Sequence, residues 1–332
     1  MTTYEALYKA FVGPLELTCL PGLHLAALTG DASKVEEYLG QGQNVNVSGE
    51  NYGAPLHAAA INGDTKTAKV LIDKGAIINA SGTAYYGSPL QTAAMLGNDA
   101  IVTLLLAEGA NINDPGAEGH GTPLQSAARS GHLTVVKLLL QKGANPNSLG
   151  KHPEGTALHA AALNGHEETV KLLLDNGASI NAECENIGTP LQAAASHEDE
   201  EVALTLTKLL LAKGASINAK ACGAAGNALT AAVTYEHEKV VQLLLDCGAN
   251  VNATGGDYGS PLCAAAVCEQ VSIAKLLRRN GAEIDKRLEN LGGTADYADW
   301  NKDEDVEQFL RAYGHAWMAY GNGSCQMSIR NE

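Results

Sequence analysis

The sequence has little aromatic and little basic character. Its 332 residues include only two Phe and two Trp, and aromatic residues make up 5% of the chain. Hydrophobic residues still reach 45%, which predicts a globular core that consists mainly of Leu, Val and Ala. Lys and Arg total 22 against 37 Asp and Glu, so the net charge is −15. Such a chain lacks the cationic surface that binds phosphate backbones, and we expect no nucleic-acid partner.

Long hydrophobic runs and closely paired cysteines are also missing. No stretch reaches about 18 consecutive apolar residues, which a membrane-spanning helix requires. The N-terminus lacks the basic segment and apolar run of a secretory leader. The seven cysteines form no Cys-x-x-Cys pair, so we interpret them as reduced thiols and expect neither a metal site nor a cofactor. These features predict an intracellular protein, cytoplasmic or nuclear, without a membrane partner.

A pattern with a period of 33 or 34 residues runs along most of the chain. Each period carries a word such as Thr122-Pro-Leu-Gln-Ser-Ala-Ala128, then a Leu run such as Leu138-Leu-Leu140. A Gly-Ala-Asn-x-Asn segment follows, as in Gly143-Ala-Asn-Pro-Asn147. The marker leucines of the first word are Leu23, Leu56, Leu90, Leu124, Leu158, Leu191, Leu229 and Leu262. Only the step from Leu191 to Leu229, which is 38 residues, exceeds 34.

Each period predicts two helices and an extended turn. Pro suits the first turn of a helix, where its missing N–H costs nothing, and a Gly closes the short Ala-rich helix. The Val and Leu run predicts a second helix whose apolar stripe faces inward. The Asn-x-Asn segment and the glycine-rich stretch after it predict an extended turn with a hairpin tip. One such unit cannot bury its apolar face alone, so the units must stack.

The Thr-Pro-Leu-His-x-Ala word and the 33-residue period resemble the ankyrin repeat family over residues 21–314. The resemblance implies an all-α repeat solenoid of about nine stacked helix-turn-helix repeats with β-hairpin tips. Variants such as Tyr86-Gly-Ser-Pro-Leu90 and Pro190-Leu-Gln-Ala-Ala194 are similar to the ankyrin arrays of filamentous fungi.

The ends of the array and its sixth repeat depart from the pattern. A capping box, Thr2-x-x-Glu5, predicts a helix over residues 2–12 within an N-terminal capping segment, residues 1–20. Residues 294–314 form a decayed ninth repeat that suits a polar cap, and 315–332 form a C-terminal tail. The additional residues of the sixth repeat fall near residues 196–204, and we expect them to extend the first helix or the loop after it.

Most histidines are explained by the repeat. The resemblance implies that His24, His57 and His159, in the Thr-Pro-Leu-His position, hold their loops by hydrogen bonds. His132, His166 and His237 follow the turn between the two helices, which is also a recurrent position. The chain lacks the motifs of zinc peptidases, serine hydrolases and phosphate-binding loops, so no catalytic residue is assigned.

The resemblance implies that binding uses the concave face, which consists of the hairpin tips and the exposed ends of the first helices. Arg129 is the only cation among the helix-end pairs, and exposed Tyr, Met and Arg are enriched in interfaces. The candidate binding residues are Tyr52, Ile61, Asn62, Tyr85, Tyr86, Met95, Leu96, His120, Arg129, Ser130, His152, Asn164, His197, Tyr235, Tyr258 and Trp300.

Three functions fit these residues. The first is a monomeric protein-protein interaction scaffold that binds an unknown partner segment in the concave groove. The second is a cofactor-independent binder of a small-molecule ligand, or an enzyme of the cyclase or isomerase type; its groove residues are Tyr86, His120, Arg129, His152 and His197. The third is an array cut from a larger signalling protein. A closed cavity of several hundred Å³ favours the second function, and an open groove favours the first.

Overall fold

The computed structural model describes residues 21–48, 53–82, 87–116, 121–150 and 155–283. The chain divides into two compact units, which we call unit 1 (Met1–Ser179) and unit 2 (Ile180–Glu332). The described residues hold the eight repeats that carry a marker leucine. The predicted N-terminal capping helix, the ninth repeat and the C-terminal tail lie outside them.

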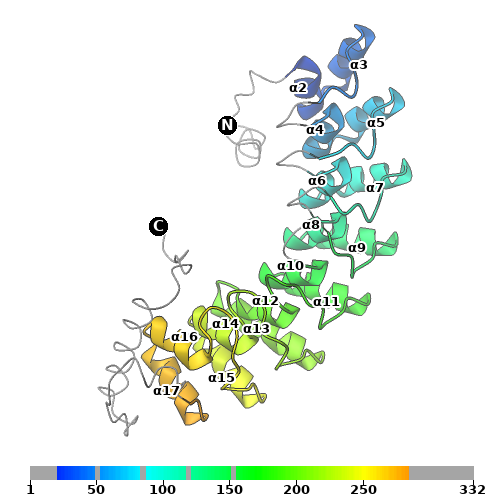
Figure 1. Ribbon diagram of the computed structural model, residues 1–332. Helices are drawn as coiled ribbons and strands as arrows, with labels where there is room; N and C mark the ends of the chain where they lie inside the picture. The colour runs from blue at the N-terminus through cyan, green and yellow to red at the C-terminus, as the bar shows by residue number, and fades with distance from the viewer. Residues whose placement is uncertain (1–20, 49–52, 83–86, 117–120, 151–154, 284–332) are drawn as a thin grey trace. The chain divides into compact units, whose positions relative to one another are not determined.

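Unit 1 contains five helix pairs among its described residues, each with an Ala-containing first helix and a second helix. The first helices are α2 (Gly22–Leu28), α4 (Pro55–Asn62), α6 (Pro89–Met95), α8 (Pro123–Arg129) and α10 (Ala157–Leu163). The second helices are α3 (Ala32–Gly40), α5 (Thr65–Asp73), α7 (Asp99–Ala107), α9 (Leu133–Gln141) and α11 (Glu167–Asp175). First helices pack on first helices and second helices on second helices, so two rows lie side by side (Figure 1).

Unit 2 continues the same plan with three described helix pairs. Its first helices are α12 (Pro190–Ala195), α14 (Ala228–Thr234) and α16 (Pro261–Val267). Its second helices are α13 (Glu200–Ala212), α15 (Glu238–Asp246) and α17 (Val271–Arg279). Within this unit the two rows again pack side by side. The eight described pairs confirm the predicted repeat solenoid of helices.

The surplus of the sixth repeat lengthens its second helix, so our expectation of a longer first helix or loop was wrong. Helix α13 has 13 residues, whereas α12 has six and α15 has nine. The side chain of Asp199 accepts hydrogen bonds from the backbone N–H groups of Glu201 and Val202, so the helix begins about one turn early. Ala203 and Leu206 are buried and continue the inward stripe of the helix through the added turn.

The core lies between the two rows of helices. On the first helices it consists of a buried leucine on each helix, such as Leu124, and of alanines such as Ala93 and Ala127, whose small side chains let neighbouring helices approach closely. On the second helices it consists of larger residues such as Leu105, Leu139 and Leu173, which are fully buried. Alanine, valine and leucine side chains therefore fill the space between the rows, in a chain with few aromatic residues.

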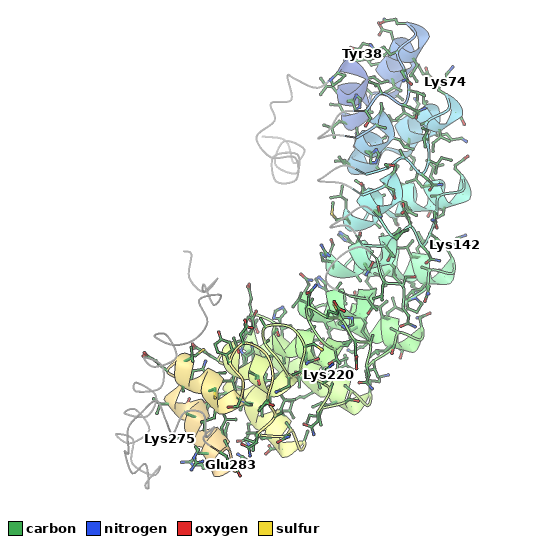
Figure 2. All side chains as sticks on the ribbon, viewed as in Figure 1. Tyr38, Lys74, Lys142, Lys220, Lys275 and Glu283 are labelled. Atoms are coloured by element: carbon green, nitrogen blue, oxygen red, sulfur yellow. The ribbon has the colours of Figure 1, made fainter. Side chains whose placement is uncertain are left out.

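Local signals begin and end the helices as the sequence predicts. Thr122 is the N-cap of α8 and Pro123 occupies the first position of the helix. Gly63 ends α4 in the left-handed conformation, with φ of 82°. Lys74 and Lys142 lie at the C-caps of α5 and α9, on the second-helix side of unit 1 (Figure 2), where a cation complements the helix dipole.

A buried polar side chain near the start of each first helix of unit 1 links it to its own loop or to the next repeat. Gln91 accepts a hydrogen bond from the backbone N–H of Ser88 and donates one to the carbonyl of Gly121, at 2.6 Å. His24 in the same position bonds the carbonyl of Gly53 at 3.0 Å. We call this position the slot. It is filled in successive repeats by His24, His57, Gln91, Gln125, His159 and Gln192.

A second link uses the last Asn of the Asn-x-Asn segment, which we call the asparagine spine. Asn147 donates from its Nδ2 to the carbonyl of Gly177 at 2.9 Å and accepts from the N–H of Ser179 at 2.7 Å. In unit 2, Asn218 makes the same two bonds to Gly248 and Asn250. Each spine residue thereby fixes the turn that ends the second helix of the following repeat.

The hairpin tips of unit 2 are narrow and stack through their backbones. Single antiparallel bridges join Cys184 to Gly188 and Cys222 to Gly226, where the sequence predicts hairpins. A Cβ at Gly223 would lie 2.0 Å from the carbonyl oxygen of Asn186, so neighbouring tips meet too closely for any side chain at this residue.

Replacing Leu173 with Ala is expected to lower the free energy of unfolding by about 2–5 kcal/mol, because a fully buried side chain of α11 leaves a cavity. The matched variant Leu172→Ala, at a half-buried position of the same helix, is expected to cost about 1 kcal/mol or less. Urea denaturation followed by circular dichroism measures both. Equal losses for the two variants would contradict the inward stripe.

Candidate functional site

Three candidate residues occupy the same place on successive first helices of unit 1. Ile61, Met95 and Arg129 end the Ala-rich words of α4, α6 and α8, and all three are partly exposed. Because α4 packs on α6 and α6 on α8, the three residues form a row, which we call the helix-end row. It presents two apolar side chains and then a guanidinium.

The backbone of the helix-end row is held by the turn of the next repeat. The ring Nε2 of His132 bonds the carbonyl of Met95 at 2.9 Å, and His166 bonds the carbonyl of Arg129 at the same distance. Asn98 holds the backbone at Ile61 in the same way, because its side chain donates to the carbonyls of Ala60 and Ile61, at 2.7 and 3.4 Å. The backbone of the row is therefore fixed before any partner arrives, so binding need not order it.

The second residue of each helix-end pair has a more structural place. Leu96, Ser130 and Asn164 are the C-caps of α6, α8 and α10. The amide of Asn164 donates to the carbonyl of Ala160 at 2.8 Å, so this exposed side chain caps its own helix. Asn62 is the last residue of α4 and is half-buried.

In unit 2, two candidate residues meet around His237. The ring Nε2 of His237 bonds the carbonyl of His197 at 2.6 Å, and the ring of Tyr235 stacks on His237 at 6.0 Å between centroids. Tyr235 is 42% exposed, and the Nδ1 of His197 accepts a hydrogen bond from the N–H of Asp199. His197 is thus held in a turn through its ring and its carbonyl.

Tyr258 is half-buried and precedes α16.

The slot histidines are structural, as the sequence predicts. His159 is fully buried, and its Nδ1 accepts the N–H of Thr156 at 3.1 Å. The Nδ1 of His57 accepts the N–H of Ala54 at the same distance. Burial lowers the pKa of His24, and it lowers the pKa of His57 to about 4. Both rings are therefore neutral at pH 7.

The remaining candidate residues, Tyr52, Tyr85, Tyr86, His120, His152 and Trp300, lie outside the described residues. Of the groove named for the small-molecule alternative, the structure places Arg129 in unit 1 and His197 in unit 2. An open hollow of about 640 Å³ lies instead on the second helices of unit 2, and none of the candidate residues lines it.

The described part of the chain contains neither a metal-binding cluster nor a membrane-spanning helix. There, no group of three or more His, Cys, Asp or Glu side chains is arranged to hold a metal ion. Among the same residues, every helix is too short or too polar to cross a membrane.

Comparison with known proteins agrees with this geometry. A family model described as ankyrin repeats, three copies, matches residues 23–116, 86–150, 124–221 and 203–287. The chain belongs to the ankyrin repeat family. In a crystal structure, the ankyrin repeat domain of human ASB11 is 31% identical, with a TM-score of 0.57 over 68% of this chain and 98% of that one. Comparison with curated proteins gives no match. Ankyrin repeats are generally protein-interaction modules.

The sequence of this ankyrin array did not lead us to predict the hydrogen bonds that hold the backbone of the helix-end row. A donor side chain stands at the N-cap of the second helix in several repeats, as Asn98, His132, His166, His237 and Gln270. Each bonds a carbonyl at the end of the first helix of the preceding repeat or, for His237, in the turn just after that helix. The signal was this recurrence of donors at one register position, with partners about 37–40 residues away.

The ankyrin array is expected to lose stability in acid through His57. The folded-state pKa of about 4 lies below the ordinary 6.5, so the unfolded chain takes up the proton first as the pH falls. Stability is complete above about pH 6.5 and declines toward pH 4, by up to about 3 kcal/mol. Denaturation midpoints across this pH range measure the effect.

The matched variant is His57→Gln, because Gln fills the same slot in α6, α8 and α12. It keeps an acceptor and a donor but does not titrate, so it should reduce the acid-induced loss while leaving stability at pH 7 nearly unchanged. His24 still titrates in this variant. An acid profile identical to that of the wild type would contradict the buried neutral ring.

Proposed function

We propose that the chain is a protein-interaction scaffold that binds a partner segment along the helix-end row of unit 1. The observation that carries this proposal is the row of Ile61, Met95 and Arg129 in three adjoining repeats, whose backbone carbonyls are held by the repeat that follows each. Membership of the ankyrin repeat family supports it, since these repeats generally bind proteins.

The chemistry of the row suits a segment with two apolar side chains and one carboxylate. Ile61 and Met95 offer partly exposed apolar surface, and Met adapts its shape to different partners. Arg129 offers a planar guanidinium that can hold a carboxylate through two hydrogen bonds. In a chain of net charge −15, a local cation also discriminates against partners with a basic residue in this place.

The repeat spacing sets the spacing of the partner residues. Packed helices lie about 8–10 Å apart, and an extended chain advances about 3.3 Å per residue. Every third residue of an extended partner therefore meets the next member of the row. The partner pattern is an apolar residue, two variable residues, a second apolar residue, two variable residues, and Asp or Glu, in either chain direction.

A cytoplasmic or nuclear location forms part of this proposal. It rests on the interpretation of the seven cysteines as reduced thiols, and the five described ones form no disulfide.

Selection from a random peptide display library against the immobilised chain tests the proposal. The selected peptides should carry the apolar, apolar, acidic pattern at intervals of three. Arg129→Glu is expected to weaken binding of these peptides by about tenfold or more, and a new selection against this variant should replace the acidic residue with Lys or Arg.

The matched control is Lys137→Glu, an exposed charge reversal on α9 of the same repeat but in the other row of helices. It should leave peptide binding unchanged. Selected peptides that lack the pattern, or that lose affinity with Lys137→Glu and not with Arg129→Glu, would show that the binding surface lies elsewhere.

A further inference from the structure

The slot of unit 2 holds a linking residue in α12 and a short one in α14. Gln192 in α12 accepts the backbone N–H of Thr189 and donates to the carbonyl of Gly226 at 2.6 Å, which joins α12 to the next repeat. Thr230 fills the same position in α14. Its hydroxyl is fully buried and has no hydrogen-bond partner among the described residues, so the link from α14 to the repeat of α16 and α17 is missing at this level.

Two more buried polar atoms lack a hydrogen-bond partner, among the described residues, on the helices that meet at this junction. They are the Nδ2 of Asn227, the N-cap of α14, and the Oε1 of Gln270, the N-cap of α17. Both side chains are more than nine-tenths buried. An unpaired buried polar atom destabilises the folded state, and water pairs with it once the junction opens. These atoms therefore favour opening.

The turn inside the repeat of α16 and α17 adds backbone strain. Glu269 lies between the two helices and has φ of 55°. Gly63 and Gly97 occupy the corresponding place in unit 1, also with positive φ. A side chain makes the left-handed conformation unfavourable, and the strain at Glu269 is released when its repeat unfolds.

The links that remain between these two repeats lie partly at a solvent-exposed edge. Asn252 of the asparagine spine donates to the carbonyl of Gly281 at 3.1 Å and accepts the N–H of Glu283 at 2.8 Å. Both bonds are exposed, so water competes for the same groups. On the buried side, Gln270 donates to the carbonyl of Val233 at 2.8 Å.

The preceding junction, from the repeat of α12 to that of α14, is held at several levels. Besides the slot bond of Gln192, the ring of His237 bonds the carbonyl of His197 at 2.6 Å. On the second helices, the carboxylate of Glu200 accepts the backbone N–H of Lys239 at 2.9 Å. The repeats of α12 and α14 are thus joined more firmly than those of α14 and α16.

We propose that α16 and α17 open as one unit while α12 to α15 stay folded. Each repeat of a solenoid is stabilised by its neighbours, so local unfolding begins at the junction with the fewest buried links. A single repeat cannot bury its apolar faces alone, and both helices therefore leave together. A ligand that binds only the closed pair suppresses the opening. This device lies in unit 2 and is independent of the helix-end row.

Hydrogen exchange of the full chain without denaturant, followed by mass spectrometry, tests the proposal. After correction for intrinsic rates, the buried amides of α16 and α17 should exchange about tenfold faster or more than those of α12 and α14. Cys263 on α16 is only 5% exposed, so its modification by iodoacetamide should follow the same opening. Equal protection of the α14 and α16 amides would overturn the proposal.

Two reciprocal double variants distinguish the slot from ordinary fraying near a chain end. Asn227→Thr with Thr230→Gln gives α14 the N-cap and slot residues of α12, and should slow exchange in α16 and α17 by about tenfold. Thr189→Asn with Gln192→Thr gives α12 the residues of α14, and should speed exchange in α14 and α15 by a similar factor.

If the first variant does not fold, the second decides alone. Unchanged exchange of α16 and α17 in a folded first variant, or of α14 and α15 in the second, would overturn the proposal.

Discussion

A polar side chain buried where two repeats meet needs a partner that its own repeat does not contain. Gln125 shows this most simply, because it accepts the N–H of Thr122 in its own repeat and donates to the carbonyl of Gly155 in the next. An unpaired buried donor or acceptor costs about 1–3 kcal/mol, so each such residue fixes the register of two repeats. The asparagine spine also links successive repeats, at the turn after the second helix. The N-cap residues of the second helices link them at the end of the first helix. The rigid helix-end row is a consequence of these links.

The repeat plan could be predicted from the sequence because its signals are local. The word around Leu124, the Gly after each Ala-rich helix and the Leu run at residues 138–140 each indicate one element without reference to the rest. The asparagine spine could not be read in this way. The residues around Asn147 are typical of an ordinary turn. Its hydrogen-bond partners, Gly177 and Ser179, lie 30 and 32 residues away in the next repeat.

The candidate site was predictable in position and only partly in role. Ile61, Met95 and Arg129 lie in one row as the period requires, whereas Asn164 caps its own helix and His197 is tied into a turn. The longer helix α13 was misjudged because the acidic run at its start has the composition of a solvated loop. Its carboxylates instead cap and pair with α15, which only the packing of neighbouring repeats reveals.

Unit 2 departs from the repeat rules in several places. Thr230 fills the slot of α14, and its hydroxyl and the Nδ2 of Asn227 are buried without a hydrogen-bond partner among the described residues. Glu236 and Glu269 take the left-handed conformation, with φ of 61° and 55°, where unit 1 uses glycine. Each such residue costs about 1–2 kcal/mol.

The slot of α8 offers the most direct measurement of the central interaction. Gln125→Leu keeps the size of the side chain and removes both hydrogen bonds, whereas Gln125→His places in the slot the residue found there in α4 and α10. Urea denaturation should show a loss of about 1–3 kcal/mol for Gln125→Leu and a clearly smaller loss for Gln125→His. A Leu variant as stable as the wild type would show that apolar packing alone joins the repeats.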